Sequence, residues 1–200
     1  MIKTRFPVHP GAFDCRVDPN GSEADIRAQS RTPEEAELSF SESYLGQLRA
    51  LTGPIPLLAV GARVLIEDDA GRFLIIRRAD SGDWGLPGGS MEIGESLMDV
   101  VFREAREEAN ASLRDVTAFG LSSNPRIENH IYPNGDQVQN ISLLAHGYLA
   151  NDDYAPTDGE ATVVAFARFD DIDEASFVAT EYPTFRHWQA FKATGRFQIV

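Results

Sequence analysis

The run from Gly88 to Ala111 most constrains how this chain can fold, because a glycine-rich loop leads directly into the clearest helical pattern of the sequence. The spacing of apolar residues predicts a helix over 95–109, since these residues recur on one side at about 100° per residue. The apolar stripe consists of Leu97, Met98, Val101, Phe102, Ala105 and Ala109. Three acids, Glu104, Glu107 and Glu108, fall on an adjoining stripe. The pattern therefore places three carboxylates on one helix face beside the core.

On both sides of this helix the sequence shows strand patterns separated by turns. We predict strands over 56–67, 72–78, 116–123, 137–149 and 162–169, a glycine-rich loop over 82–89, and a final helix over 182–193. The first two strands form a hairpin around a turn at 68–71. Because strands and helices do not alternate strictly, we expect an α+β fold in which a mixed β-sheet lies between helices as an α/β/α sandwich.

The N-terminal region differs in composition from the rest of the chain. Residues 1–40 are polar and rich in proline, glycine, aspartate and serine. We predict a helix from Thr32 through Leu51, whose modest apolar stripe is made of Tyr44, Leu45, Leu48 and Leu51. Residues 1–31 are too polar to form a core. We therefore expect an N-terminal extension over 1–54, partly irregular with a short helix, and a main domain over 55–200.

The charge balance and the cysteine content limit the possible partners. Eighteen Lys and Arg against 31 Asp and Glu give a formal net charge of −13, so a nucleic-acid duplex would be repelled. A small anionic substrate would be repelled as well, unless a divalent cation lies between it and the acids. The single Cys15 cannot form an intramolecular disulfide, and no export signal or membrane anchor is visible. We expect a cytoplasmic protein without nucleic-acid or membrane partners.

The three carboxylates of the predicted helix are poorly placed for stability alone. Glu104 and Glu108 are a like-charge pair one turn apart, and all three acids lie near the helix C-terminus, where the dipole disfavours anions. One interpretation is a solvated charged face on which Arg103 pairs with Asp99 and Glu107. The other is a cation site, because Mg²⁺ prefers clustered oxygen ligands.

The same residues resemble a known family motif. Gly89, Glu95, Arg103, Glu104, Glu107 and Glu108 match all but one of the fixed positions of the Nudix box of the Nudix hydrolases. The departure is Asn110, where the family usually has glycine, and both residues tolerate the left-handed conformation at a helix C-terminus. The loop over 84–89 is also similar to the one that precedes the box in many members, and the resemblance covers about 55–173. It implies the Nudix fold.

The resemblance implies a reaction and a cofactor. Nudix hydrolases cleave a phosphoanhydride in a nucleoside diphosphate linked to a second moiety. Glu104, Glu107 and Glu108, helped by the backbone carbonyl of Gly88, would bind Mg²⁺ or Mn²⁺. The metal would neutralise the diphosphate charge and activate a water for in-line attack. An acidic protein can then bind an anionic substrate.

Catalytic roles follow from the same resemblance. Arg103 and Glu95 would pair and hold the loop and the helix together. The general base would be a box glutamate such as Glu107, or an acid on a later loop, for which Glu160 is the candidate. Glu92 is a further candidate near the substrate. An ordinary turn acid is the alternative interpretation of Glu160.

The candidate substrate contacts lie around the expected cleft. Arg78 ends a strand and could contact phosphate, and Trp84 lies in the loop before the box. His130 and Tyr132 flank a turn and could stack on a base, although an isolated histidine is more often structural. Pro125 lies one residue short of a spacing associated with members that cleave ADP-ribose.

Several functions remain open at this point. An ADP-ribose or nucleotide-sugar substrate is favoured, followed by nucleoside triphosphates, as in MutT-like house-cleaning enzymes, and then by dinucleoside polyphosphates. A non-catalytic nucleotide-binding module is disfavoured because no box carboxylate is lost. The related isopentenyl diphosphate isomerase needs a cysteine in its site, and Cys15 lies far before the box. The resemblance also favours a homodimer.

Overall fold

The structure, a computed structural model, describes residues 40–132, 134–157 and 159–200. All described residues belong to one compact unit, residues 37–200. The predictions made for Thr32 and for residues 1–31 lie outside the described residues.

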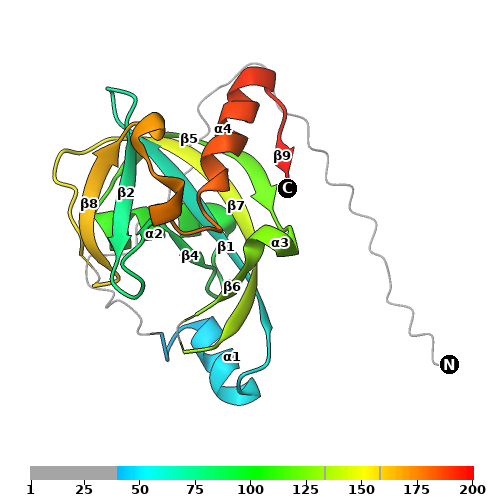
Figure 1. The fold of residues 1–200 in the computed structure, drawn as a ribbon. Coiled ribbons are helices and arrows are strands. Elements are labelled where there is room, and N and C mark those ends of the chain that lie inside the picture. The colour runs from blue at the N-terminus through cyan, green and yellow to red at the C-terminus, as the bar shows by residue number, and fades with distance from the viewer. Residues whose placement is uncertain (1–39, 133, 158) are drawn as a thin grey trace. The chain divides into compact units, whose positions relative to one another are not determined.

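The predicted strands and helices are present, and several short elements join them (Figure 1). In chain order the described elements are α1 (Tyr44–Thr52), β1 (Leu57–Glu67), β2 (Phe73–Arg78), β3 (Trp84–Gly85), β4 (Gly88–Ser90), α2 (Leu97–Ala109), β5 (Leu113–Ser122), α3 (Pro125–Glu128), β6 (Asn129–Ile131), β7 (Gln137–Leu149), β8 (Ala161–Ala167), α4 (Pro183–Thr194) and β9 (Gln198–Ile199), with 3-10 helices at Phe169–Asp171 and Glu174–Ser176. Sequence reasoning missed β3, β4, α3, β6 and β9 because elements of two to four residues are too short to show a period. Within the described part, no helix is long and apolar enough to cross a membrane.

Two strands far apart in the sequence form the centre of the sheet. β1 and β7 run parallel along their whole length, from Leu57 opposite Val138 to Glu67 opposite Tyr148. β5 pairs antiparallel with β7, and β4 pairs antiparallel with β1. β2 meets β1 in the predicted hairpin and pairs antiparallel with β3 and β8. The sheet of the described strands is mixed, as predicted.

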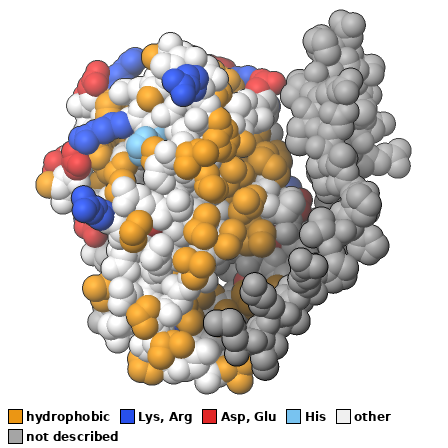
Figure 2. All heavy atoms as spheres, turned by 90° about the vertical axis from the view of Figure 1, so that its right-hand side faces the viewer, with side chains coloured by type: hydrophobic (Ala, Val, Ile, Leu, Met, Phe, Trp, Pro, Cys, Tyr) orange, Lys and Arg blue, Asp and Glu red, His pale blue; other side chains and the backbone are white. Residues whose placement is uncertain are grey.

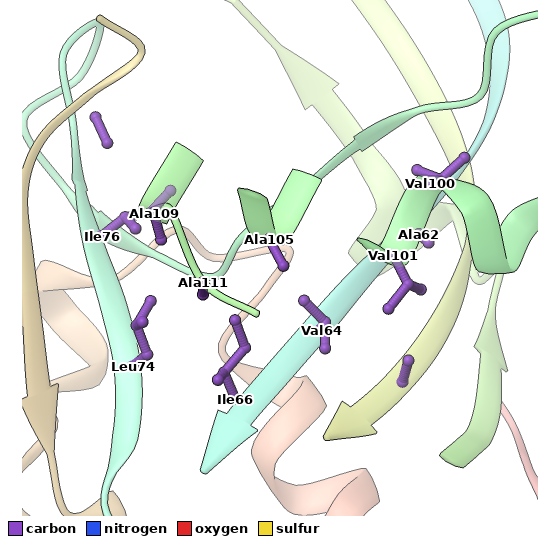
Figure 3. Close-up of a cluster of buried hydrophobic side chains, with 12 residues drawn as sticks. Ala62, Val64, Ile66, Leu74, Ile76, Val100, Val101, Ala105, Ala109 and Ala111 are labelled. Carbon is purple, nitrogen blue, oxygen red and sulfur yellow. The ribbon is translucent and has the colours of Figure 1, made fainter. Parts of the chain in front are cut away.

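The two longest helices cover opposite faces of this sheet. Val64 and Ile66 of β1 pack in one buried cluster with Val101, Ala105 and other residues of α2, as Figure 3 shows. Leu65, which lies between them in β1, packs in a second cluster with Phe185 and Trp188 of α4. Because successive side chains of a strand point to opposite faces, this division places the sheet between two helical layers. The predicted α/β/α arrangement is confirmed.

The first described helix, α1, begins much later than predicted. Its N-cap is Ser43, whose side chain accepts a hydrogen bond from the backbone N–H of Gly46, and residues 40–42 form a turn. The predicted apolar stripe is only partly correct. Leu45 is buried against Ala59 and Val138, whereas Leu51 is 84% exposed.

The box helix α2 begins at Leu97, two residues after the predicted start. Ser96 and Asp99 form a capping box, in which each side chain accepts a hydrogen bond from the other residue's backbone N–H. Asp99 therefore caps the start of the helix. At the C-terminus Asn110 adopts the left-handed conformation with φ of 49°, as its tolerance for this region predicts.

The apolar stripe of α2 is rotated relative to the prediction. Val100 is fully buried although it was not assigned to the stripe, and Phe102 is 44% exposed although it was. Glu104 and Glu108 are buried together with the apolar residues. The side of α2 that faces the sheet therefore includes two of the three carboxylates, which hydropathy alone assigns to solvent.

Candidate active site

The loop before α2 contacts the helix through the backbone of Gly88. Gly88 lies opposite Arg63 in the β4–β1 ladder, next to the position where Val64 donates its N–H to the Pro87 carbonyl. Alternation in an antiparallel pair leaves the N–H and C=O of Gly88 pointing away from β1. The N–H is donated to Glu108 Oε2, 2.8 Å away. The Gly88 carbonyl, a predicted metal ligand, therefore lies on the side of β4 that meets Glu108.

Gly89 is a position where no side chain fits. A Cβ atom there would lie 2.2 Å from Glu104 Oε1 and 2.6 Å from its carboxyl carbon. Contacts this short do not occur between real atoms, so the carboxyl group of Glu104 occupies the space above the loop backbone. The glycine of the motif is explained by this close approach of the loop to the helix.

Glu104 and Glu108 are carboxyl groups held in an unfavourable environment. Burial raises the pKa of Glu104 to about 7 against the opposing charge of Arg103, and Glu107 and Glu160 add to the increase. Burial also raises the pKa of Glu108 well above its usual range, and the neighbouring Glu104 contributes. Glu107 is different, because its side chain is 35% exposed.

Arg103 connects the loop to three acids. Its guanidinium bonds Glu95 through Nε (2.7 Å) and Nη2 (3.1 Å), and donates from Nη2 to the Ser90 carbonyl at 2.9 Å. Nη1 bonds Glu104 Oε1 at 2.7 Å and Glu107 Oε2 at 2.9 Å. The predicted pairing of Arg103 with Glu95 is present, and it joins the loop to the helix.

The donor set of this region suits a divalent cation. Among the described residues, no three carboxylate, imidazole or thiol side chains already lie together as a ligand set, and Arg103 is bonded to two of the predicted ligands. The chemistry nevertheless fits a hard cation, because Glu104 and Glu108 are buried oxygen donors whose like charges oppose each other. A cation would compete with Arg103 Nη1 for Glu104 and Glu107.

Arg78 lies beside these carboxylates, together with an acid that sequence reasoning missed. Burial alone lowers the pKa of the Arg78 guanidinium, but the charges of Glu181, Asp80 and Glu108 raise it overall. Glu181 Oε2 accepts the N–H of Leu86 at 2.7 Å, and its pKa is raised by burial. Glu181 precedes α4 and is separated from Leu86 by 95 positions, so no local signal could have indicated it.

Glu160 lies at the start of β8, near the end of β2. Its backbone carbonyl accepts the N–H of Ala79 at 2.8 Å, and the residue is exposed. Its charge contributes to the raised pKa of Glu104. The candidate base therefore lies within electrostatic reach of the box, and its catalytic role stays a prediction.

Three other candidates make local contacts. Glu92 accepts the N–H of Tyr44 at 2.8 Å through Oε2, at the start of α1. Trp84 is half-buried against the α4-side core, with the Arg77 guanidinium 5.3 Å from its ring centre. His130 packs edge-to-face against Tyr132 at 4.4 Å between ring centres. The substrate contacts of Glu92, Trp84 and His130 stay predictions.

Comparisons with known proteins agree with this geometry. The family model described as the NUDIX domain matches residues 57–189. A MutT-like protein of Streptomyces ambofaciens is 29% identical over 131 residues, which cover 66% of this chain and 77% of that protein. The nucleoside triphosphatase NudI of Salmonella agona is 30% identical over 101 residues, covering 47% of this chain and 71% of that protein.

A solved structure shows the same fold. The crystal structure of an ADP-ribose pyrophosphatase from Streptococcus suis superposes with a TM-score of 0.52 at 18% identity, covering 71% of this chain and 98% of that one. At this level of identity the similarity concerns the fold alone. The family match extends over most of the chain, from β1 into α4, and includes the whole loop and helix described above. The chain therefore belongs to the Nudix hydrolase family.

Proposed function

We propose that this protein is a Mg²⁺- or Mn²⁺-dependent pyrophosphohydrolase that cleaves a phosphoanhydride in a nucleoside diphosphate linked to another moiety. The observation that carries the proposal is the pair of buried carboxylates, Glu104 and Glu108, packed against the backbone of Gly88 and Gly89. Buried like charges on one face are costly to stability unless a cation or a ligand uses them.

The metal would be held by Glu104, Glu107 and Glu108 with the Gly88 carbonyl. When bound, it supplies charge neutralisation at the diphosphate and lowers the pKa of a coordinated water. The chain's own residues perform the positioning. Arg103 ties the helix to Glu95 and to the loop, so the carboxylates and the Gly88 carbonyl keep their relative places.

The proton of the attacking water needs an acceptor. Glu160 is proposed for this role because it is exposed next to β8 and because its charge contributes to the raised pKa of Glu104. Glu107, the most exposed of the three box acids, is the alternative acceptor. Changing Glu160 to Gln separates the two, since loss of the base lowers kcat and shifts its pH profile without removing the metal ligands.

For the substrate we favour an ADP-ribose or nucleotide-sugar compound. The Streptococcus suis structure of the same fold is named an ADP-ribose pyrophosphatase, whereas the Salmonella relative is named a nucleoside triphosphatase. Triphosphates are therefore the second candidate, and dinucleoside polyphosphates the third. Intact box carboxylates argue against a purely nucleotide-binding role.

The deciding experiment compares kcat/KM for ADP-ribose, nucleotide sugars and nucleoside triphosphates at one Mg²⁺ concentration. The favoured substrate should release a nucleoside monophosphate and a sugar phosphate. A tenfold or greater preference for triphosphates, with release of pyrophosphate, would replace this substrate assignment. Absence of hydrolysis across the panel with either metal would overturn the proposed function itself.

The proposal includes a homodimer and a cytoplasmic location. Figure 2 shows that hydrophobic side chains gather over a broad area of one face. Large hydrophobic residues exposed in the described part include Leu58, Ile131, Phe197 and Ile199. Such areas often mark contacts with other chains. Light scattering coupled to size-exclusion chromatography measures the mass in solution, and a monomer at all concentrations would remove the dimer from the proposal.

A further inference from the structure

A pocket of about 330 Å³ lies next to Arg78, outside the carboxylate cluster. Three segments form its walls: Arg78 with the following turn at 80–83, strand β6, and residues 178–180 before α4. The volume is at the lower end of the range usual for small-molecule sites. The pocket is therefore large enough for one ring system with a sugar.

The chemistry of the walls distinguishes this pocket from a phosphate site. Asp80 pairs with Arg78 at 3.2 Å and so offsets the one cation of the lining. The half-buried carboxylate of Asp83 has no hydrogen-bond or ion-pair partner among the described residues. An anionic group would meet this uncompensated charge, whereas a hydroxyl or N–H group would donate to it.

Two further groups add hydrogen-bonding and stacking capacity. Asn129 accepts a bond from Gln137 Nε2 at 2.8 Å through Oδ1, which leaves its Nδ2 available as a donor. Burial and the charge of Arg78 lower the pKa of His130, which favours the uncharged form of its ring. The lining thus combines an acceptor, a donor and an uncharged aromatic ring.

A buried ion pair holds two of the walls. Arg63 Nη2 bonds Glu128 Oε2 at 2.7 Å and Ser142 Oγ at 3.1 Å, and Arg63 Nη1 donates to the Thr180 carbonyl. Glu128 directly precedes β6, and Thr180 itself lines the pocket. Through these bonds Arg63 connects the residue before β6 to the 178–180 wall.

This ion pair is poorly explained by stability. Arg63 and Glu128 are 6% and 0% exposed, and Glu128 Oε1 has no hydrogen-bond partner. Two desolvated charges with an unsatisfied oxygen contribute little net stability compared with apolar residues of the same size. The Arg63–Glu128 pair is better explained if it sets the distance between the β6 wall and the 178–180 wall.

Arg78 lies between the pocket and the carboxylates of the Nudix box. Its side chain lines the pocket, and its charge interacts with those of Glu181 and Glu108. We propose that the pocket binds the uncharged nucleoside end of the substrate through Asp83, Asn129 and His130, that Arg78 lies between this end and the phosphates, and that Arg63 sets the pocket width. This inference rests on the proposed function, and it adds the place and the residues of nucleoside recognition.

The first test measures binding without catalysis. AMP, GMP, CMP, UMP and ribose 5-phosphate are titrated calorimetrically into the full chain in the presence of chelator. We expect at least one nucleotide to bind at least tenfold more tightly than ribose 5-phosphate. Asp83→Asn or Asn129→Ala should remove most of this difference. Asp152→Asn, an exposed acid of the β7–β8 loop, is the matched control and should bind like the wild type.

The outcomes separate this inference from the proposed function. Nucleotides that bind no better than ribose 5-phosphate, or equally well to the Asp83 and Asn129 variants, overturn the inference even if hydrolysis is observed. Selective nucleotide binding without hydrolysis of any substrate supports the inference and overturns the proposed function. Movement of the His130 ring signals in NMR spectra on adding adenosine supports the assigned place, and unchanged signals contradict it.

The second test concerns Arg63 as a positioning residue. Because one unpaired buried charge could unfold the chain, both partners are replaced together, as Arg63→Met with Glu128→Leu. We expect KM for the best substrate to rise tenfold or more while kcat changes less than threefold. If kcat and KM both keep their wild-type values, Arg63 does not set the pocket width. A loss of kcat at unchanged KM, together with a lower thermal midpoint, would indicate a purely structural role and overturn this part.

Discussion

The carboxylate of Glu108 accepts the backbone N–H of Gly88 at 2.8 Å, which joins the C-terminal half of the box helix to the loop before it. Glu108 is 1% exposed, so this contact is made away from water. The second carboxylate oxygen of Glu108 and the backbone carbonyl of Gly88, which points away from β1, could therefore bind the same cation.

Glu108→Gln should lower kcat/KM by several orders of magnitude while the fold is retained. Glutamine can still accept the Gly88 N–H, but it lacks the charge that a divalent cation needs. Activity is measured at saturating Mg²⁺, with circular dichroism as a check of folding. Glu174→Gln, an exposed acid at the surface, is the control. Turnover of Glu108→Gln close to that of the wild type would contradict the metal assignment.

Glu104→Gln should raise the thermal midpoint in the presence of chelator. Burial raises the pKa of Glu104 from 4.5 to about 7, so the folded state binds a proton that the unfolded state has lost. The carboxylate therefore costs nothing below pH 4.5, and its cost grows as the pH rises to about 7. The advantage of the variant should be small at pH 5 and reach several degrees at pH 8, at about 2–4 °C per kcal/mol. A lower midpoint for the variant at pH 8 would show that Glu104 is stabilised by its partners.

Asn110 should anchor the β7–β8 loop to the end of α2. Its Nδ2 donates to the Asp153 carbonyl at 2.7 Å, and its own carbonyl accepts Nδ2 of Asn151 at 2.8 Å. Asn110→Gly loses the side-chain bond, worth about 0.5–1.5 kcal/mol. Asn110→Ala loses the same bond and, unlike glycine, keeps a Cβ at φ of 49° without the polar side chain that lets asparagine tolerate this conformation. It should therefore be about 1–2 kcal/mol less stable than the glycine variant. Urea unfolding should rank both the wild type and the glycine variant above the alanine variant, and an alanine variant as stable as glycine would be inconsistent with this account.

His146 should make the protein less stable in mild acid. Burial lowers its pKa below 6.5 against the effect of Glu67, which bonds its Nε2 at 2.8 Å. Below pH 6.5 the unfolded chain therefore binds a proton that the folded chain resists, and the free energy of unfolding falls as the pH falls. His146→Gln, which can still bond Glu67, should show a smaller loss between pH 7 and pH 5. Equal slopes for the two proteins in denaturant titrations would exclude His146 as the cause.

Deletion of residues 1–31 should leave a folded and active hydrolase. The segment is too polar to form a core, and the described core is built from residues 45–188. Solubility, circular dichroism and kcat/KM of the shortened chain are compared with those of the full chain. An insoluble or inactive product would show that the segment completes the core or the site.

The sequence by itself determined the elements and the motif. A helix with a 3.6-residue period and strands with a period of two are local patterns, so α2 and β7 could be predicted closely from neighbouring residues. The spacing of Glu95 and Arg103 likewise predicted their pairing, because loop and helix are adjacent in the chain. Even here hydropathy misplaced Phe102 and left the burial of Glu104 unseen.

The tertiary structure decided which distant residues meet. The parallel pairing of β1 with β7 brings Arg63 to Ser142, and the chain before α4 brings Thr180 and Glu181 to the same region. None of these residues follows a pattern with its sequence neighbours, because its partner lies many tens of positions away. Their contacts form only when the strands assemble into the sheet and α4 packs on it. Burial and the pairing of buried polar groups depend on the whole fold, so they produce no periodic pattern in the local sequence.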